Sequence, residues 1–446
     1  MTEATATAAA VSRETLDARL ARSPGWLADR RSAAWDAFTG LSFPSAARDE
    51  DWRRTDVSEL HLERFGPSGP AAEEVVALAR RRHAEAMPGA ALVLSGPDGA
   101  TSMENAESLL AQGVIVSSLE DAATRHPELV QRGLASVGTG ESYFTVLWNA
   151  LWCGGVFVYV PHGVEAMTPL WIGHLAAGEG AAAFPATVVV VEERASLTLV
   201  EDLVALREAG PSLSVAVTAL GLAAEARVDD IAVQHLSAEA WHFATRRASC
   251  DRSAHYRLFG ATLGARTQKA YWDVLLDGDG AEADIFGVCF AGGDQHLDHQ
   301  SLQVHRGRDT RSNLLLKVAA RDRAHSVYSG LIDVLPSAVH ADGYVANRNL
   351  LLSHGSGASG VPRLEIKAND VRCGHGTTVG HVDDEERFYL MARGVPADEA
   401  ERLIVRGFFA DVLDRVPVET ARDWLVELMN AEIGQGPGQA AAEALA

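Results

Sequence analysis

The spacing of hydrophobic residues changes twice along the chain and divides it into three regions. In the first part, apolar residues recur at helical spacing, as in Ala71–Ala86, with loops between the predicted helices. Short runs rich in Val, Ile, Leu, Phe and Tyr then follow one another between Gly, Asp and Asn, which is typical of strands and turns. Helical spacing returns after Gly380. We therefore expect a mostly helical N-terminal region at 1–150, a β core at 151–382 and a C-terminal helical region at 383–446.

The first two regions contain further predicted elements. Short helices are expected at Glu104–Gln112 and Leu119–Gly133, and short strands at Ala91–Leu94 and Val114–Val116. The predicted strands of the core are Val156–Val160, Thr187–Val191, Leu197–Val200, Leu213–Val217, Trp272–Leu276, Ile285–Phe290, Asn313–Val318, Val327–Leu331, Asn349–Leu352 and Arg363–Ala368.

Two architectures fit a core in which strand follows strand without a long amphipathic helix. One is a pair of β-sandwiches and the other is a solenoid of stacked turns. Hairpin signals are scarce, apart from Asp277-Gly278 and Asp342-Gly343. Polar residues recur within the strand runs, as an internal ladder of side chains would allow. Both features favour a solenoid, but the pattern alone leaves both architectures open.

Three helices are predicted after the core. Asp383–Gly394 begins with acidic residues and ends at a glycine, and Pro396 opens a longer helix that runs to Val416. The last predicted helix is Thr420–Ala431. The longer helix carries an apolar stripe formed by Leu403, Ile404, Phe408, Val412 and Leu413.

The charge of the chain restricts its partners. Among 446 residues, 60 are Asp or Glu and 39 are Lys or Arg, which gives a formal net charge of −21. This acidity argues against nucleic acid or an anionic membrane surface as the main partner. No apolar run approaches the roughly 20 residues that span a bilayer, and the N-terminus lacks the layout of a signal peptide. We expect a cytoplasmic protein.

Nucleotide-binding motifs are missing or stand in the wrong context. The motif GxxxxGK[ST] does not occur, which excludes a P-loop. Gly355, Gly357 and Gly360 form one GxGxxG, but Val361-Pro362 and a predicted strand follow it, where a phosphate site needs a helix. We interpret these glycines as a flexible surface turn.

Histidines gather in the second half of the core. One short segment contains His296, His299 and His305 beside Asp294 and Asp298. Imidazole and carboxylate ligands suit zinc or iron(II), but the spacing matches no closed structural zinc site. A hydrogen-bonded or solvated histidine face is the alternative that we favour.

The four cysteines are separated along the chain, at Cys153, Cys250, Cys289 and Cys373, and we expect reduced thiols. Cys373 stands two residues before His375, and in a strand these side chains share one face. A neighbouring imidazole favours the thiolate, which attacks sulfur or binds a soft metal. Because an unpaired cysteine often only packs, the motif alone leaves function and packing open.

Four segments together resemble the SufB/SufD family of iron–sulfur cluster assembly proteins. Arg363–Phe409 is similar to the C-terminal signature of the family, and Ala346–Ser353 and Gly280–His305 are similar to its core segments. Asp49–Leu60 resembles the Trp-Arg-Thr-Asp motif near the SufD N-terminus. This motif and the Cys-x-His pair resemble SufD more than SufB.

The resemblance implies a mainly β fold, a right-handed parallel β-helix flanked by helical N-terminal and C-terminal regions. It implies a non-catalytic scaffold subunit that pairs with SufB, docks the ATPase SufC and holds no cofactor alone. Cys373 and His375 would lie on an edge rung, face the second subunit and handle iron or a nascent cluster with it. His299 is followed by Gln300 where relatives commonly have a second histidine, which weakens His299 as a ligand.

The resemblance also assigns roles to the two helical regions. Trp52, Arg53, Thr55 and Asp56 form the N-terminal motif, for which anchoring of the N-terminal region is favoured over a direct partner contact. The expected SufC dock contains, or has directly behind it, Phe388, Leu390, Leu403, Phe408 and Phe409, although an apolar helical stripe also serves ordinary packing within the chain.

Two alternatives stay open. Parallel β-helices include enzymes that act on polysaccharides with clustered carboxylates, for which Asp294, Asp298 and Asp309 are the candidates. The chain could also form a homodimer with SufC when SufB is absent, using the same end surface twice.

Overall fold

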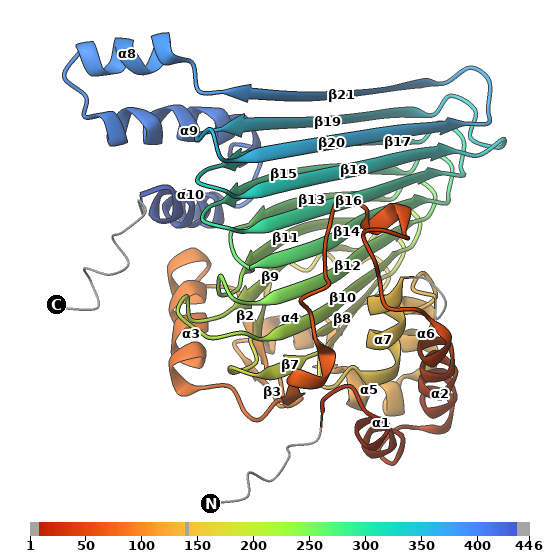
Figure 1. Ribbon diagram of the computed structural model, residues 1–446. Coiled ribbons are helices and arrows are strands. Elements are labelled where there is room, and N and C mark those ends of the chain that lie inside the picture. The colour runs from red at the N-terminus through yellow and green to blue at the C-terminus, as the bar shows by residue number, and fades with distance from the viewer. Residues whose placement is uncertain (1–8, 139–141, 435–446) are drawn as a thin grey trace, which may run out of the picture.

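Strands dominate the computed structural model, which describes residues 9–138 and 142–434. Within this part of the chain they build a parallel β-solenoid of about eight turns (Figure 1). From β8 onward, successive strands alternate between two sheets, so that a strand pairs in parallel with the strand two places later. The solenoid is confirmed, and the two-sandwich alternative is wrong.

The strand bounds are as follows. The first sheet contains β4 (Ile115–Ser118), β5 (Val156–Val160), β8 (Ala186–Val191), β10 (Leu213–Leu222), β12 (Trp241–Cys250), β14 (Thr267–Leu276), β16 (His296–His305), β18 (His325–Val334) and β20 (Gly357–Ile366), with β1 (Gly66–Pro67) and β7 (Ala181–Ala183) beside this series. The second sheet contains β3 (Thr101–Glu104), β2 (Ala91–Ser95), β6 (Leu170–Leu175), β9 (Ser196–Val204), β11 (Arg227–His235), β13 (His255–Thr262), β15 (Glu282–Ala291), β17 (Arg311–Ala320), β19 (Asp342–Leu351) and β21 (Arg372–His381).

One repeated corner leads from the first sheet to the second. At each of these corners a single residue has a positive φ, for example Glu225 at 61° and His340 at 64°. Its N–H donates to a carbonyl in the corner of the next turn, as from Glu225 to Arg252 at 2.8 Å and from His340 to Asp370 at 2.9 Å. The corners therefore stack with the strands, which explains why hairpin signals are scarce in the sequence.

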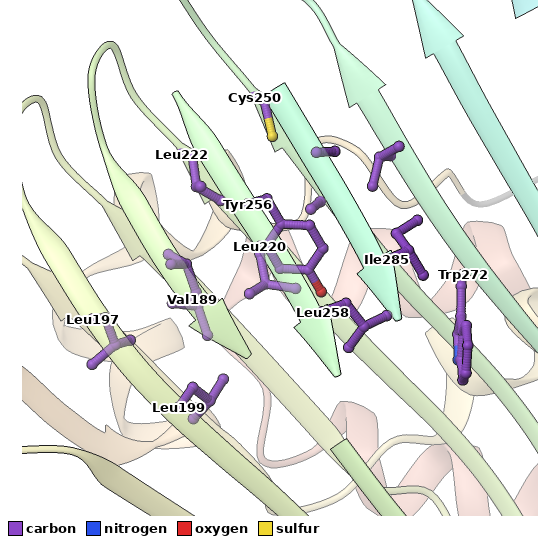
Figure 2. Packing of buried hydrophobic residues seen from close by; sticks show 14 of the residues in the cluster. Val189, Leu197, Leu199, Leu220, Leu222, Cys250, Tyr256, Leu258, Trp272 and Ile285 are labelled. Atoms are coloured by element: carbon purple, nitrogen blue, oxygen red, sulfur yellow. The ribbon is translucent and has the colours of Figure 1, made fainter. Parts of the chain in front are cut away.

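The space between the two sheets is filled mainly by apolar side chains. Figure 2 shows Leu220, Tyr256, Leu258 and Ile285 pointing into this interior. The wide ring of Trp272 fits because two strands of the facing sheet carry glycines, Gly260 and Gly287, at whose positions an added Cβ would lie 2.5 and 2.7 Å from that ring. Close packing of this kind makes the solenoid a rigid frame.

Helices cover the outer faces of both sheets unevenly. Apolar residues of the N-terminal helices pack on the first strands of the first sheet; these helices are α1 (Arg13–Leu20), α2 (Gly25–Gly40), α5 (Leu119–Arg125), α6 (Pro127–Gly133) and α7 (Tyr143–Leu151). The second sheet is covered by α3 (Glu73–Ala86), α9 (Ala397–Leu413) and α10 (Glu419–Gly434). Short elements complete the order, namely η1 (Glu50–Trp52), η2 (Leu62–Arg64) and α4 (Glu107–Ala111). The remaining helix, α8 (Asp384–Ala392), has no buried residue and projects beside the last turn (Figure 1).

Every predicted core strand overlaps a strand of the structure, and the predicted helices at Ala71–Ala86 and Thr420–Ala431 overlap α3 and α10. The predicted helix Leu119–Gly133 is divided into α5 and α6 at Pro127. The surface turn predicted from the glycine motif is confirmed for Gly355, but it is wrong for Gly357 and Gly360, which lie inside β20. None of the helices in the described ranges is both long and apolar enough to cross a membrane.

Candidate functional site at the terminal turn

The solenoid ends in two strands that each have a partner on one side only. In the described part of the chain, β20 pairs with β18 and β21 pairs with β19, and neither has a further neighbour in its sheet. Their remaining edges therefore present backbone N–H and C=O groups that no strand within residues 9–138 and 142–434 satisfies. Such an edge is a template for pairing with another chain.

Cys373 and His375 lie on β21, and both face the interior side of this last turn. The register pairs Cys373 with Gly343 and His375 with Val345, whose side chain is buried in the core. Cys373 is half-buried against that core, whereas His375 is exposed because no further turn covers it. The predicted shared face is confirmed. The pair points into the open end of the solenoid rather than away from its interior, and it is not sealed inside the chain.

The Cys373 thiol is not activated in the chain by itself. Burial raises its pKa and the charge of Asp342 raises it further, while a hydrogen bond with the backbone of Gly343 lowers it. The thiolate that the sequence suggested is therefore disfavoured here. A metal ion or a partner cation at the open end would reverse this preference.

The other face of β21 is covered beside the site by one aromatic side chain of β19. The ring of Tyr344 lies against it, and a Cβ added at Gly374 would come within 3.3 Å of that ring. Tyr344 keeps 48% of its surface exposed. The glycine between the two candidate ligands thus provides room for an exposed aromatic residue of the neighbouring strand.

The predicted docking residues on the C-terminal helices differ in how far they are exposed to solvent. Phe388 on α8 is 73% exposed and Leu403 on α9 is 41% exposed, whereas Leu390 and Phe408 are partly buried. Phe409 is fully buried and belongs to the core beneath α9. Lys317 of β17 fixes this helix, since its Nζ donates to the Phe408 carbonyl at 2.6 Å. Of the five predicted docking residues, Phe409 can therefore only lie behind a contact surface.

The N-terminal motif lies in a segment, here termed the N-terminal strap (Asp49–Leu60), that crosses the first sheet (Figure 1). Trp52 is 6% exposed and packs on Phe144 and Phe243. Thr55 Oγ1 donates to Asp298 Oδ2 at 2.6 Å. These contacts support the anchoring role that the sequence favoured for Trp52 and Thr55.

The other two motif residues face solvent. Arg53 pairs with Glu50 at 2.8 Å, and Asp56 accepts a hydrogen bond from the backbone N–H of Ser58 at 2.9 Å. Both contacts are local to the strap, so these side chains do not fasten it to the sheet.

Family models match almost the whole chain. The model described as "SUF system FeS cluster assembly, SufBD core domain" covers residues 174–408, and the model described as "SufBD protein N-terminal region" covers residues 12–172. The chain belongs to the SufB/SufD family.

Its relatives include the SufD protein of Bacillus subtilis, 26% identical over 92% of this chain and 95% of that protein. The SufB protein of the same organism is also 26% identical, over 89% of this chain and 83% of that protein. A SufBD family protein of Mycobacterium leprae is 31% identical over 56% of this chain and 62% of its own length.

The three candidate histidines of this SufB/SufD-family chain, His296, His299 and His305, are hydrogen-bonded residues of the framework. His299 is buried between Thr262 and Gln268, and His305 bonds to Thr310 and Ser312, all at 2.8–3.1 Å. Burial lowers the pKa of each of these two histidines to about 4. His296 contacts the strap, and burial lowers its pKa to about 4 as well. No three His, Cys, Asp or Glu side chains gather into a metal site within the residues that the structure describes.

The candidate carboxylates of the polysaccharide alternative lie in separate contacts. Asp294 forms two hydrogen bonds with the exposed Arg323, at 2.6 and 2.7 Å. Asp298 is buried against Lys269 at 2.5 Å, and Asp309 pairs with His340 at 2.8 Å. Each carboxylate is held by its own basic partner.

Sequence reasoning missed a charged cluster inside the solenoid. Arg246 contacts both Glu201 and Asp230, and His174 lies 3.1 Å from Glu201. All four side chains are buried. Tyr256 Oη donates to Asp230 at 2.7 Å. The signal in the sequence was a pair of adjacent acidic residues in each of two strands, Glu201-Asp202 in β9 and Asp229-Asp230 in β11. Such a fully buried network favours a unique register of the turns.

Proposed function

We propose that this chain is the SufD-like, non-catalytic scaffold subunit of an iron–sulfur cluster assembly complex. It pairs with SufB through the terminal turn, docks the ATPase SufC on its C-terminal helices and handles iron or a nascent cluster between the subunits. The observation that carries the proposal is the Cys373/His375 pair at the open end of the solenoid.

Pairing with SufB is supported by the free edges of β20 and β21. Ten-residue strands with unsatisfied backbone groups suit a partner whose solenoid also ends in parallel strands. The exposed imidazole of His375 and the half-buried thiol of Cys373 then face the seam between the subunits.

Shared handling of iron is supported by the number of donors. Cys373 and His375 supply one soft sulfur and one imidazole nitrogen, a set that suits iron or an iron–sulfur cluster. Two donors leave the coordination incomplete, so further ligands come from SufB. The cargo is therefore held only in the assembled pair.

The ATPase dock is supported by apolar exposure on the C-terminal helices. Phe388, Tyr389 and Met391 on α8 are 73%, 58% and 44% exposed, and Leu403 on α9 adds a further apolar side chain. A helix with no buried residue gains little from its own chain, so a partner surface supplies the missing contacts.

Co-expression with SufB and SufC tests the site. We expect Cys373→Ala and His375→Ala to leave the purified complex intact but to lower its iron and acid-labile sulfide severalfold. His381→Ala is the matched control, because His381 is an exposed imidazole on the same strand. Unchanged iron and sulfide in both site variants, or an equal loss in the control, would contradict the assignment.

A second experiment tests the dock. Phe388→Ala combined with Leu403→Ala should reduce co-purification of SufC while SufB remains bound. Met167→Ala serves as the control, since Met167 is 77% exposed elsewhere on the surface. Retention of SufC by the double variant would contradict this contact surface.

The free edge also favours a second assembly, a homodimer of this chain with SufC when SufB is absent. The same strands would then pair with a second copy. Light scattering of the chain with SufC alone, and again after addition of SufB, distinguishes the two assemblies. Exchange of the homodimer into a heterodimer supports SufB as the working partner.

A further inference from the structure

A recessed cavity lies on the outer face of the second sheet, far along the chain from the terminal strand. It has a volume of about 380 Å³ and is formed by the first residues of β9, β11 and β13. Ala166, in the loop before β6, closes one side, and its backbone N–H is already bonded to Ser196. The polar lining consists of Ser196, Thr198, Arg227, Asp229, His255 and Arg257.

The register of the sheet places these side chains in two neighbouring rows. Ser196, Arg227 and His255 are aligned across the three strands in the first row. Thr198, Asp229 and Arg257 are aligned in the second row, two positions further along each strand. Residues two apart in a strand share a face, so all six point out of the same side of the sheet.

The negative charge in this cavity is already neutralised. Arg257 forms a bidentate pair with Asp229, at 2.5 and 2.7 Å, and the Asp229 side chain is only 22% exposed. His255 Nε2 lies 3.3 Å from Asp284, which is on the next strand outside the cavity and also accepts from Asn313. Asp229, in the cavity lining, and Asp284, beside it, therefore each have a basic partner.

The positive charge is not neutralised. Among the described residues, the Arg227 guanidinium has no ion pair and no side-chain hydrogen bond. The hydroxyls of Ser196 and Thr198 also form no hydrogen bond with a described residue. The cavity thus presents one uncompensated cation and two hydroxyl donors on a chain whose formal net charge is −21.

We propose that this cavity binds a tetrahedral oxyanion of the phosphate type. The Arg227 guanidinium supplies charge-assisted hydrogen bonds, and the hydroxyls of Ser196 and Thr198 supply further donors. The guanidinium has several N–H donors and the two hydroxyls add one each, so together they can bond to several oxygens of a tetrahedral anion. The ligand is either the free ion or the phosphate group of a larger molecule such as a nucleotide.

Calorimetric titration of the full chain with inorganic phosphate at constant ionic strength tests the proposal. We expect Arg227→Gln to weaken binding about tenfold or more, because a hydrogen bond to a charged group is lost. Arg311→Gln is the matched control, since Arg311 occupies the same row on β17, is exposed and lies outside the cavity. The unfolding midpoint of both variants confirms that they are folded.

Titration with AMP separates the two sources of the ligand. Binding of both phosphate and AMP supports the phosphate group of a larger molecule, whereas binding of phosphate alone supports the free ion. The proposal is overturned if the unmodified chain does not bind millimolar phosphate, if Arg311→Gln loses as much affinity as Arg227→Gln, or if AMP binds where phosphate does not.

Discussion

Thr55 and Asp298 are joined by a hydrogen bond of 2.6 Å although they lie 243 residues apart in the chain. Asp298 also contacts Lys269 at 2.5 Å, and the Lys269 ammonium lies 5.1 Å from the centre of the Trp52 ring. Both partners of this ion pair are outward-facing residues of the first sheet, and both are at most 1% exposed because the N-terminal strap covers them. The strap is therefore fastened by a buried charged contact as well as by apolar packing.

Replacing Thr55 tests this attachment. Thr55→Val removes a donor to a buried carboxylate, and we expect the free energy of unfolding to fall by about 1–3 kcal/mol. Urea denaturation measures the change. Thr39→Val is the control, because Thr39 is exposed and its hydroxyl donates to a backbone carbonyl within its own helix, α2. An unchanged midpoint for Thr55→Val would show that the strap is held by Trp52 and its apolar neighbours alone.

The free energy of unfolding should decrease as the pH decreases, because His299 of β16 is buried without a charge. The pKa of His299 is about 4 in the folded chain against about 6.5 in an unfolded one. The unfolded chain therefore takes up a proton in this window while the folded chain does not, and unfolding becomes easier as the pH decreases from 6.5 to 4. For this residue we expect a loss of about 2 kcal/mol between about pH 7 and about pH 5.

Comparing two variants isolates this histidine from other titrating groups. His299→Gln should make urea unfolding less dependent on pH than in the unmodified chain, whereas His162→Gln, at an exposed loop position, should not. Identical pH dependence in His299→Gln and the unmodified chain would contradict the burial of an uncharged imidazole.

The thiols should differ in reactivity. Because burial raises the pKa of Cys373, we expect it to react with iodoacetamide near neutral pH more slowly than the thiol of a short peptide. The fully buried Cys250 and Cys289 should not react in the folded chain. Mass spectrometry of digested samples measures each rate. Reaction of Cys373 faster than the peptide would instead mean that His375 activates it.

The two phenylalanines assigned to the dock should behave differently in stability measurements. Phe409→Ala removes a fully buried ring, and we expect a loss of about 3–5 kcal/mol. Phe388→Ala, at a position 73% exposed, should change stability by no more than about 0.5 kcal/mol. Thermal unfolding of both variants checks the contrast. A large loss for Phe388→Ala would place that ring in the packing of this chain and remove it from the dock.

The strands that the sequence predicted are mostly short apolar runs between polar corners. Other strands were not predicted because polar residues interrupt their apolar runs, as in β12 and β16. The solenoid was harder to recognise, although its corners carry a repeated signal. An alanine follows the positive-φ corner residue in several turns, as at Ala195, Ala226 and Ala254. Each of these alanines is at most 1% exposed, and Thr310 is buried at the equivalent position after Asp309.

The candidate site was predictable in position but not in environment. Alternation along a strand placed Cys373 and His375 on one face, as the structure has them. The direction of that face depends on β19, whose Val345 is buried, and a single strand contains no information about its neighbour. For the same reason the burial of Phe409 and the partners of Asp298 could not be inferred from spacing.

The uncapped last turn has a consequence for the chain when no partner covers it. Two parallel strands with unsatisfied edges remain adhesive until another chain covers them, and only Pro362 interrupts the row of donors on β20. We expect copies whose last turn is uncovered to associate with one another through these edges, and this tendency should decrease when another chain covers them.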